Sequence, residues 1–489
     1  MDVLKHKLNP GKRRQSGLRA AMFIQFGAKY INVALTLIVT MVLARILTPA
    51  QYGVMSVISV FLGLFSVISN VGIGAAVVQY RDLSDDECSG LLSFTFLLGI
   101  VLAFAFCFLS FPISLAYGNE EYVPMMCLAS LSVVFNAANM VPNGILLRDK
   151  MFLTSGVRLV VTSLASSLIA ILLALKGLGV YSLILNTVLQ ALFVLIWNLI
   201  SIDLPIGNRE MKSALNKIKR FSSFQFLSQV LQYFIRNLDN MLIGAVLGST
   251  TLGYYDKAYR LAKYPIEIVP STIGPVLKSF FSAAEGDLNR IYDLFYKVEK
   301  TMSIVGVFAS VFFALSASEL IGLFFGGQWA DSVEPFAILS VSIVFQMLNY
   351  MVFSVLEGLK RTDYLFKHIL ITSLTMVAML LIGLKIGTLN AVASMVSAYF
   401  IFSTIPFLYF VVYKGFGRSV TKFVLGFAPE FCSGLLSGLV MAAVSRLLPT
   451  PSLLSLFLKL VCGGGAYLLL IWKLGQIRYL KMLFKRSVN

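Results

Sequence analysis

The sequence predicts an all-α polytopic membrane protein with about fourteen transmembrane helices. Of the 489 residues, 58% are hydrophobic and only 13% are charged, whereas soluble domains carry about 25% charged residues. Apolar runs of about 20 residues recur along the whole chain, and each is long enough to cross a hydrocarbon core of about 30 Å. Such runs exclude a membrane β-barrel, whose strands alternate over about ten residues.

The predicted spans form three groups. The first six are 22–47, 54–79, 89–115, 122–147, 154–175 and 179–200; the next six are 223–247, 254–281, 299–317, 334–358, 365–387 and 390–413; the last two are 423–447 and 453–473. We expect an N-terminal lobe (1–200), a C-terminal lobe (222–413) and an appended pair of helices with a basic tail (414–489). Residues 201–221 join the lobes, either as an amphipathic helix on the cytoplasmic surface or as an ordinary charged linker.

Basic residues are distributed unevenly between the two sides of the predicted membrane. The side that holds both termini carries 29 of the Lys and Arg residues, and the opposite side carries four. By the positive-inside rule, both termini lie in the cytoplasm. The net charge of +17 therefore reflects membrane topology and does not indicate a nucleic-acid partner.

A polar stripe interrupts the seventh span. Arg236 and Asp239 lie one turn apart near its middle, where a charge costs about 2.5–3.5 kcal/mol on insertion scales. At helical spacing the stripe also contains Gln225, Gln229, Gln232 and Asn240. Arg236 therefore faces a ligand, or it forms a structural pair with Asp239 or a neighbouring helix.

The first span carries a similar stripe at an offset of 200 residues. Its members are Gln25, Lys29, Asn32, Thr36 and Thr40, which correspond in position to residues 225, 229, 232, 236 and 240. Six-span halves related by duplication, with binding at their interface, are a common plan among transporters. We therefore expect two pseudo-symmetric six-helix lobes.

The eighth span combines cations with prolines. Its charged residues are Lys257, Arg260, Lys263 and Glu267, and its prolines are Pro265, Pro270 and Pro275. Each proline removes a helical hydrogen bond, so we expect a hinge in this helix. Lys257 and Arg260 either line a cavity or extend to the lipid headgroups.

Cations outnumber acids at membrane depth, which indicates an anionic ligand. Arginine binds phosphate in a fork and lysine acts as a point charge. Lys29 and Arg158, near the cytoplasmic ends of their spans, either contribute to this site or extend to the headgroups. Asp239 and Glu267, interpreted as buried acids, hold a coupling H⁺ or Na⁺ or, as we favour, neutralise neighbouring cations.

The sequence contains no pattern typical of an enzyme or a cofactor site. We find no paired-histidine metal motif, phosphate-binding glycine loop or nucleophile elbow. The predicted outer loops are too short for a catalytic site that polymerises or ligates sugars. We therefore expect a transporter without a metal ion or cofactor.

Four segments carry a resemblance to a known family: LARIL with YG within 43–53, GIG at 72–74, GYYDKAYRLA at 253–262 and FGGQW at 325–329. The chain resembles bacterial polysaccharide transporters of the multidrug/oligosaccharidyl-lipid/polysaccharide superfamily, and within it Wzx-type oligosaccharide flippases of the colanic-acid-exporter kind. The resemblance implies two lobes around a central cavity in the bacterial inner membrane. It also implies an undecaprenyl-diphosphate-linked oligosaccharide as substrate, whose diphosphate enters a cationic cavity.

The resulting hypothesis is a flippase that works by alternating access. The cations expected to attract the diphosphate are Arg236, Lys29, Lys257, Arg260, Lys263 and Arg158, and the expected sugar path is Gln25, Asn32, Gln225, Gln229, Gln232 and Asn240. Expected partners are the lipid-linked substrate, the bilayer, H⁺ or Na⁺ and polysaccharide polymerase or assembly proteins. The alternatives are a drug or cation antiporter of the same fold, which would need acids in its cavity, a membrane enzyme, and a scaffold for polysaccharide assembly.

Overall fold

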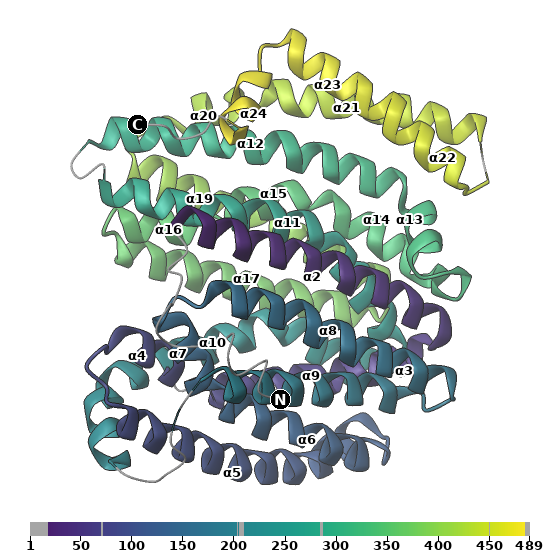
Figure 1. Ribbon diagram of the computed structural model, residues 1–489. Coiled ribbons are helices and arrows are strands. Elements are labelled where there is room, and N and C mark those ends of the chain that lie inside the picture. The colour runs from purple at the N-terminus through teal and green to yellow at the C-terminus, as the bar shows by residue number, and fades with distance from the viewer. Residues whose placement is uncertain are drawn as a thin grey trace. The chain divides into compact units, whose positions relative to one another are not determined.

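The computed structural model is helical throughout the part of the chain that it describes (Figure 1). The described residues are 18–69, 72–202, 204, 210–283, 287–448 and 450–484. Within the helices, the side chains of residues 18–26, 218–232, 235, 269–283 and 481–484 lie outside the description. The prediction of an all-α protein is confirmed.

The chain divides into two compact units, Met1–Ala245 and Val246–Asn489. The first contains α2 (Leu18–Ile46), α3 (Pro49–Ser69), α4 (Ile73–Gln79), α5 (Asp85–Tyr117), α6 (Tyr122–Ala138), α7 (Met140–Arg148), α8 (Phe152–Leu175), α9 (Val180–Ser201) and most of α10 (Met211–Leu247). The second contains α11 (Ser249–Ala283), α12 (Leu288–Leu315), α13 (Ala317–Phe324), η2 (Gly327–Ser332), α14 (Val333–Val341), α15 (Ile343–Asn349), α16 (Val352–Gly358), α17 (Thr362–Ile386), α18 (Leu389–Phe402), α19 (Thr404–Phe407), η3 (Leu408–Gly415), α20 (Val420–Gly426), α21 (Ala428–Leu447), α22 (Leu453–Leu458), η4 (Lys459–Gly463), α23 (Gly464–Lys473) and α24 (Ile477–Phe484).

Within the described residues, eleven helices are long and apolar enough to cross a membrane, or twelve when the bent pair Gly327–Val341 and Ile343–Gly358 forms one span. These twelve correspond to all the predicted spans except 223–247 and 254–281. The latter two coincide with α10 and α11, whose side chains are described only in part. The protein is thus a multi-pass helical membrane protein, and the total of fourteen spans stays a prediction.

Prolines explain two breaks in spans that were predicted to be continuous. α6 ends at Ala138 and α18 ends at Phe402, and each of these residues is followed four positions later by a proline, Pro142 or Pro406. A proline has no N–H to donate to the carbonyl four residues earlier, so the helix loses a hydrogen bond there. A new helical segment starts within two residues of each break.

α10 begins in the predicted linker 201–221 and continues into the seventh predicted span as one helix. Lys217 Nζ lies 2.7 Å from Glu87 Oε1, and the Ser213 hydroxyl donates to the same carboxylate at 3.0 Å. The hydrogen bond to Glu87 raises the pKa of the Lys217 ammonium. Ala214 is fully buried in an apolar cluster with residues of α4, α5 and α7. The first turns of α10 therefore pack on the helices of their own unit.

The turns before α8 and α17 have the same backbone conformation. Lys150 has φ 56° and Lys360 has φ 57°, a left-handed conformation that is uncommon for residues other than glycine. In both turns the lysine N–H donates to the carbonyl three residues earlier, and the next N–H donates to the carbonyl five residues earlier. These turns lie 210 residues apart, so the two units share this local geometry. The two pseudo-symmetric six-helix lobes stay a prediction.

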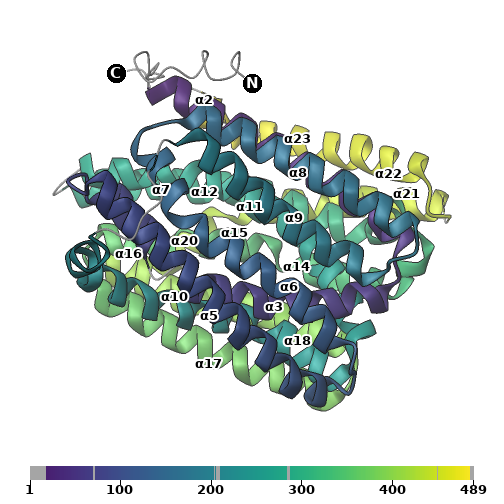
Figure 2. The same ribbon diagram turned by 60° about the horizontal axis from the view of Figure 1, so that its bottom comes forward.

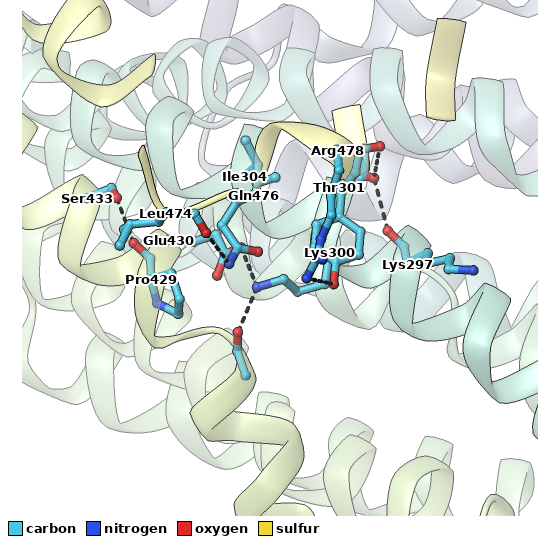
Figure 3. Close-up of polar contacts among 12 residues, drawn as sticks. Lys297, Lys300, Thr301, Ile304, Pro429, Glu430, Ser433, Leu474, Gln476 and Arg478 are labelled. Atoms are coloured by element: carbon cyan, nitrogen blue, oxygen red, sulfur yellow. Dashed lines mark hydrogen bonds and ion pairs between the residues drawn. The ribbon is translucent and has the colours of Figure 1, made fainter. Parts of the chain in front are cut away.

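α12 contacts the last helices of the second unit through buried polar groups (Figure 3). The Lys300 side chain is 1% exposed and forms an ion pair with Glu430 of α21, which is fully buried. Lys300 Nζ also donates to the carbonyl of Gly426 at 2.7 Å. The Lys300 ammonium lies 5.5 Å from the centre of the Tyr479 ring, and the Thr301 hydroxyl donates to the Tyr479 carbonyl at 3.1 Å. One turn of α12 thus binds α20, α21 and α24.

A second buried ion pair joins α13 to the last predicted span. Lys459 Nζ lies 2.5 Å from Glu319 Oε1 and also donates to the carbonyl of Leu315 at 2.8 Å. The Ser455 hydroxyl donates to the same carboxylate oxygen at 2.9 Å. α21 and α23 run side by side in both ribbon views (Figures 1 and 2), so the two ion pairs connect both ends of this helix pair to the α12–α13 segment.

The Lys300–Glu430 pair predicts a large loss of stability when its acid is neutralised. Glu430→Gln leaves the Lys300 ammonium buried without a countercharge, which costs about 3–5 kcal/mol. We expect a clear fall in the apparent Tm of the purified protein in detergent.

Glu299→Gln is the matched control for this experiment. Glu299 is also fully buried, and neither of its carboxylate oxygens has a hydrogen-bond partner among the described residues. A carboxyl in this setting is neutral because burying its charge alone is too costly, so the glutamine should leave Tm nearly unchanged. Equal Tm values for the two variants would contradict the assignment of the ion pair.

Candidate functional site

Two tyrosines hold the charged segment of α10 against other helices of the first unit. The Tyr233 hydroxyl donates to the carbonyl of Val60 in α3 at 2.5 Å. It lies over Gly63, where an added Cβ would be 2.2 Å from the hydroxyl oxygen. The Tyr117 hydroxyl of α5 donates to the carbonyl of Met241 at 3.0 Å. Both contacts require close approach of α10, and Gly63 makes the first one sterically feasible.

Arg236 and Asp239 lie between these two anchors and differ in exposure. Arg236 is exposed, whereas Asp239 is only 1% exposed. The guanidinium also acts electrostatically on the Tyr233 hydroxyl. The positive charge of the stripe is thus accessible and the negative charge is covered. An anionic ligand that reaches α10 therefore meets the arginine first.

Two asparagines of the predicted sugar path have unsatisfied amide oxygens. Asn32 Oδ1 on α2 and Asn240 Oδ1 on α10 are buried, and neither accepts a hydrogen bond from any described residue. A buried acceptor without a donor costs about 1–3 kcal/mol. A hydroxyl-rich ligand would supply such donors. Lys29, one turn before Asn32, is exposed.

Arg158 lies at the centre of an asparagine cluster. Its Nη1 donates to Asn143 Oδ1 at 3.1 Å and to Asn198 Oδ1 at 2.5 Å. Asn198 in turn donates to Asn139 Oδ1 at 2.5 Å. These residues come from α7, α8, α9 and the break between α6 and α7. Amides orient the guanidinium but do not neutralise it, so the cluster keeps its positive charge.

In the second unit, two segments that carried the family resemblance pack against each other. The Tyr254 ring meets the edge of the Trp329 ring, with 6.1 Å between centroids. Trp329 is fully buried, and its ring also contacts the Phe325 ring at 5.9 Å. Lys257 is 3% exposed, and its ammonium lies 6.0 Å from the centre of the Phe325 ring. The segment 253–262 is therefore a packing motif as well as a source of cations.

The other cations of α11 differ in their surroundings. Arg260 Nε lies 2.8 Å from Asp256 Oδ1, and the arginine side chain is 59% exposed. The Lys263 ammonium lies 4.2 Å from the centre of the Tyr259 ring, a cation–π contact. Arg260 and Lys263 are thus accessible at the surface of this unit, unlike Lys257.

Part of the predicted site lies outside the described residues. This holds for the side chains of Gln25, Gln225, Gln229, Gln232, Pro270 and Pro275. α11 is helical through all three proline positions, Pro265 included. The hinge therefore stays a prediction, as do the roles assigned to the cations and the sugar path.

Sequence reasoning misplaced the buried acids. Glu267 was expected to be buried, but it is exposed. Within the described part of the chain, five acids that were not singled out are buried, namely Glu87, Asp256, Glu299, Glu319 and Glu430. All except Glu430 lie within two residues of an end of a predicted span, where a charged side chain can extend to the headgroups. For Glu319, the charge of Lys459 inside an apolar run was the signal that a buried acid is present. Among the described residues, no group of three or more His, Cys, Asp or Glu residues could hold a metal ion.

Comparisons with solved structures identify the fold. The structure titled "Lipid II flippase MurJ, inward closed conformation" matches with a TM-score of 0.72 and 15% sequence identity, covering 94% of this chain and 99% of that one. A multidrug resistance MATE family transporter in an inward-facing conformation matches with a TM-score of 0.62 and 16% identity, covering 82% and 98%. The chain therefore has the fold that these two transporters share.

Comparisons of sequence identify the family. The "Lipopolysaccharide biosynthesis protein WzxC" of Escherichia coli (strain K12) is 23% identical over 367 residues, which is 73% of this chain and 74% of the relative. The family model described as "Polysaccharide biosynthesis protein" matches residues 42–334, more than half of the chain. The chain is thus a member of the polysaccharide biosynthesis protein family.

Proposed function

We propose that this protein is a flippase for lipid-linked oligosaccharides. It moves undecaprenyl-diphosphate-linked repeat units from the cytoplasmic to the outer leaflet of the bacterial inner membrane, for the synthesis of a surface polysaccharide. The protein acts as a transporter and not as an enzyme. We also propose that the chain crosses the membrane fourteen times, that it contains two six-helix lobes and that both termini lie in the cytoplasm.

The Arg158 cluster is the observation that carries this proposal. A cation that donates to two asparagines is solvated without being neutralised, so its free energy improves when an anion arrives. In the second unit, by contrast, the buried ammonium groups of Lys300 and Lys459 are each paired with a carboxylate, that of Glu430 and that of Glu319. Arg158 is hydrogen-bonded to neutral amides instead, which suits a site that receives a diphosphate.

The known relatives support the same class of substrate. The Escherichia coli relative is named for lipopolysaccharide biosynthesis, and the solved structure with the same fold is named a lipid II flippase. The first name refers to the biosynthesis of a lipopolysaccharide, and the second to the movement of a lipid across a membrane. The predicted polar path fits the sugar part of such a substrate, because Asn32 and Asn240 present unsatisfied acceptors for hydroxyl groups.

Alternating access would expose the cationic groups to each side in turn. Arg236, Lys29, Arg158 and the α11 cations would attract the diphosphate. Bending of α11 at its prolines would accompany the change of state. H⁺ or Na⁺ coupling through Asp239 or Glu267 remains part of the proposal, with neutralisation of nearby cations as the favoured role of these acids. A polysaccharide polymerase or assembly protein would receive the product.

The alternative is a drug or cation antiporter, because a multidrug resistance transporter has a similar fold. Cationic drugs need accessible acids along the translocation path, whereas in the α10 stripe Asp239 is buried and Arg236 is exposed. Restored surface polysaccharide in a flippase-deficient strain supports the flippase. Drug resistance without restored polysaccharide supports the antiporter and contradicts our proposal.

Arg236→Ala should abolish restoration of the surface polysaccharide while leaving the amount of protein unchanged. The reason is that the accessible charge of the α10 stripe is lost. Arg446→Ala is the control, because Arg446 is also exposed but lies at the end of α21. Staining of surface polysaccharide and an immunoblot of membranes measure the two quantities. Wild-type export by Arg236→Ala would remove this residue from the site.

Two replacements of Arg158 distinguish the contribution of its positive charge from that of its guanidinium geometry. Loss of a charge-assisted hydrogen bond costs about 1.5–3 kcal/mol, which is about 10–100-fold in binding. We expect Arg158→Ala to reduce export about tenfold or more. Arg158→Lys should retain an intermediate level, because the charge stays while the fork geometry is lost.

The apparent Tm of both Arg158 variants provides the second readout. A purely structural arginine would make export follow the loss of Tm in both variants. Reduced export by Arg158→Ala at a Tm equal to that of Arg158→Lys supports a role in binding the substrate.

A further inference from the structure

A polar cavity opens where three connections of the second unit meet. Its volume is about 430 Å³, which falls in the range of about 300–1,000 Å³ typical of small-molecule sites. Thr251 comes from the start of α11, Asp331 and Glu334 from η2 and α14, and Thr388 and Asn390 from the start of α18. In the predicted topology all three connections lie on the outer side of the membrane, opposite the termini.

The cavity has fixed hydrogen-bonding groups. Asn390 Nδ2 donates to Glu334 Oε2 at 2.6 Å, which orients the carboxylate and uses one of its two oxygens. Thr388 caps α18 by accepting from the Ala391 N–H at 3.2 Å. The residues on this wall are therefore held by their own helices, and the carboxylates keep capacity to accept further hydrogen bonds.

An aromatic ring forms another part of the wall. Tyr254 lines the cavity, and its ring rests on the edge of the fully buried Trp329 ring. The Ser332 hydroxyl donates to the Tyr254 carbonyl at 3.1 Å, and Asp331 lines the same cavity as Tyr254. These contacts fix the position of Tyr254 beside the acid.

This combination fits a sugar that carries no negative charge. Carboxylates accept hydrogen bonds from neighbouring hydroxyl groups, and a tyrosine ring offers an apolar surface to the C–H face of a pyranose. Two carboxylates in one cavity repel phosphate and uronic acids. The same cavity favours an amino sugar, whose ammonium adds an ion pair.

We infer that this cavity is a saccharide-binding site, which takes a neutral or amino-bearing pyranose of the translocated oligosaccharide at the outer face. The inference rests on the proposed function and adds a second location to it. The cationic groups hold the diphosphate, and the acidic cavity holds a sugar after it has crossed the membrane. Because the cavity repels phosphate, the diphosphate end of the substrate is disfavoured in the acidic cavity.

Saturation-transfer NMR on the full chain in lipid nanodiscs tests the inference. The probes are the methyl β-glycosides of glucose, glucosamine and glucuronic acid. We expect transfer to the first two and none to the glucuronide. Glu334→Gln and Asp331→Asn should each weaken glucoside binding about tenfold, the lower end expected for a lost charged hydrogen bond.

Glu120→Gln serves as the matched control, because Glu120 is an exposed acid in the predicted outer connection of the first unit. It should bind the glucoside like the wild type. The use of two cavity variants keeps the test valid if one of them does not fold.

Three results would overturn the inference. The first is absence of transfer to any glycoside in the wild type. The second is equal binding of the glucoside by the wild type and both cavity variants. The third is binding of the glucuronide by the wild type that is as strong as its binding of the glucoside. In the first of these cases, calcium binding that depends on Glu334 would identify the cavity as a cation site. Complementation separates this outcome from the proposed function: a wild-type chain that restores polysaccharide but binds no glycoside refutes the cavity alone.

Discussion

The cost of burying charge in an apolar surrounding determines how this protein is built. Each buried cation needs a partner from within the chain. Lys300 and Lys459 meet this requirement with Glu430 and Glu319, at the two ends of the α21–α23 pair. Because neither partner can be removed alone without leaving a buried charge, these pairs fix α21 to α12 and η4 to α13.

Arg158 meets the same requirement in a different way. Its hydrogen bonds go to Asn143 and Asn198, which are neutral, so the first unit retains a net positive charge at this point. This chain therefore contains two kinds of buried or partly buried cation, those paired with a carboxylate and those hydrogen-bonded to amides. Neutralised pairs stabilise the fold, and amide-solvated cations remain available for an anion. This distinction, more than the number of cations, indicates where a diphosphate would be received.

The sequence was sufficient for the all-helical membrane fold, because long apolar runs determine it locally. It also indicated an unusual segment at 253–262. It did not show that Lys257 is buried, because that depends on contact with Phe325, about 70 residues later in the chain. The breaks before Pro142 and Pro406 had a visible cause, but averaging over a span-length window conceals it. Buried Glu430 was missed because its partner Lys300 lies in another predicted span and was counted as a cytoplasmic surface charge.

The paired turns at Lys150 and Lys360 bear on how the two halves have diverged. The first spans align at an offset of 200 residues, whereas these turns are 210 apart. On the proposed duplication, the second half is longer between α12 and α14, where residues 316–332 stand in the place of residues 118–121 between α5 and α6. That insertion carries Trp329 and Asp331. On our proposals, a change in the length or composition of this one connection would alter the saccharide cavity and leave the long helices of both units unchanged.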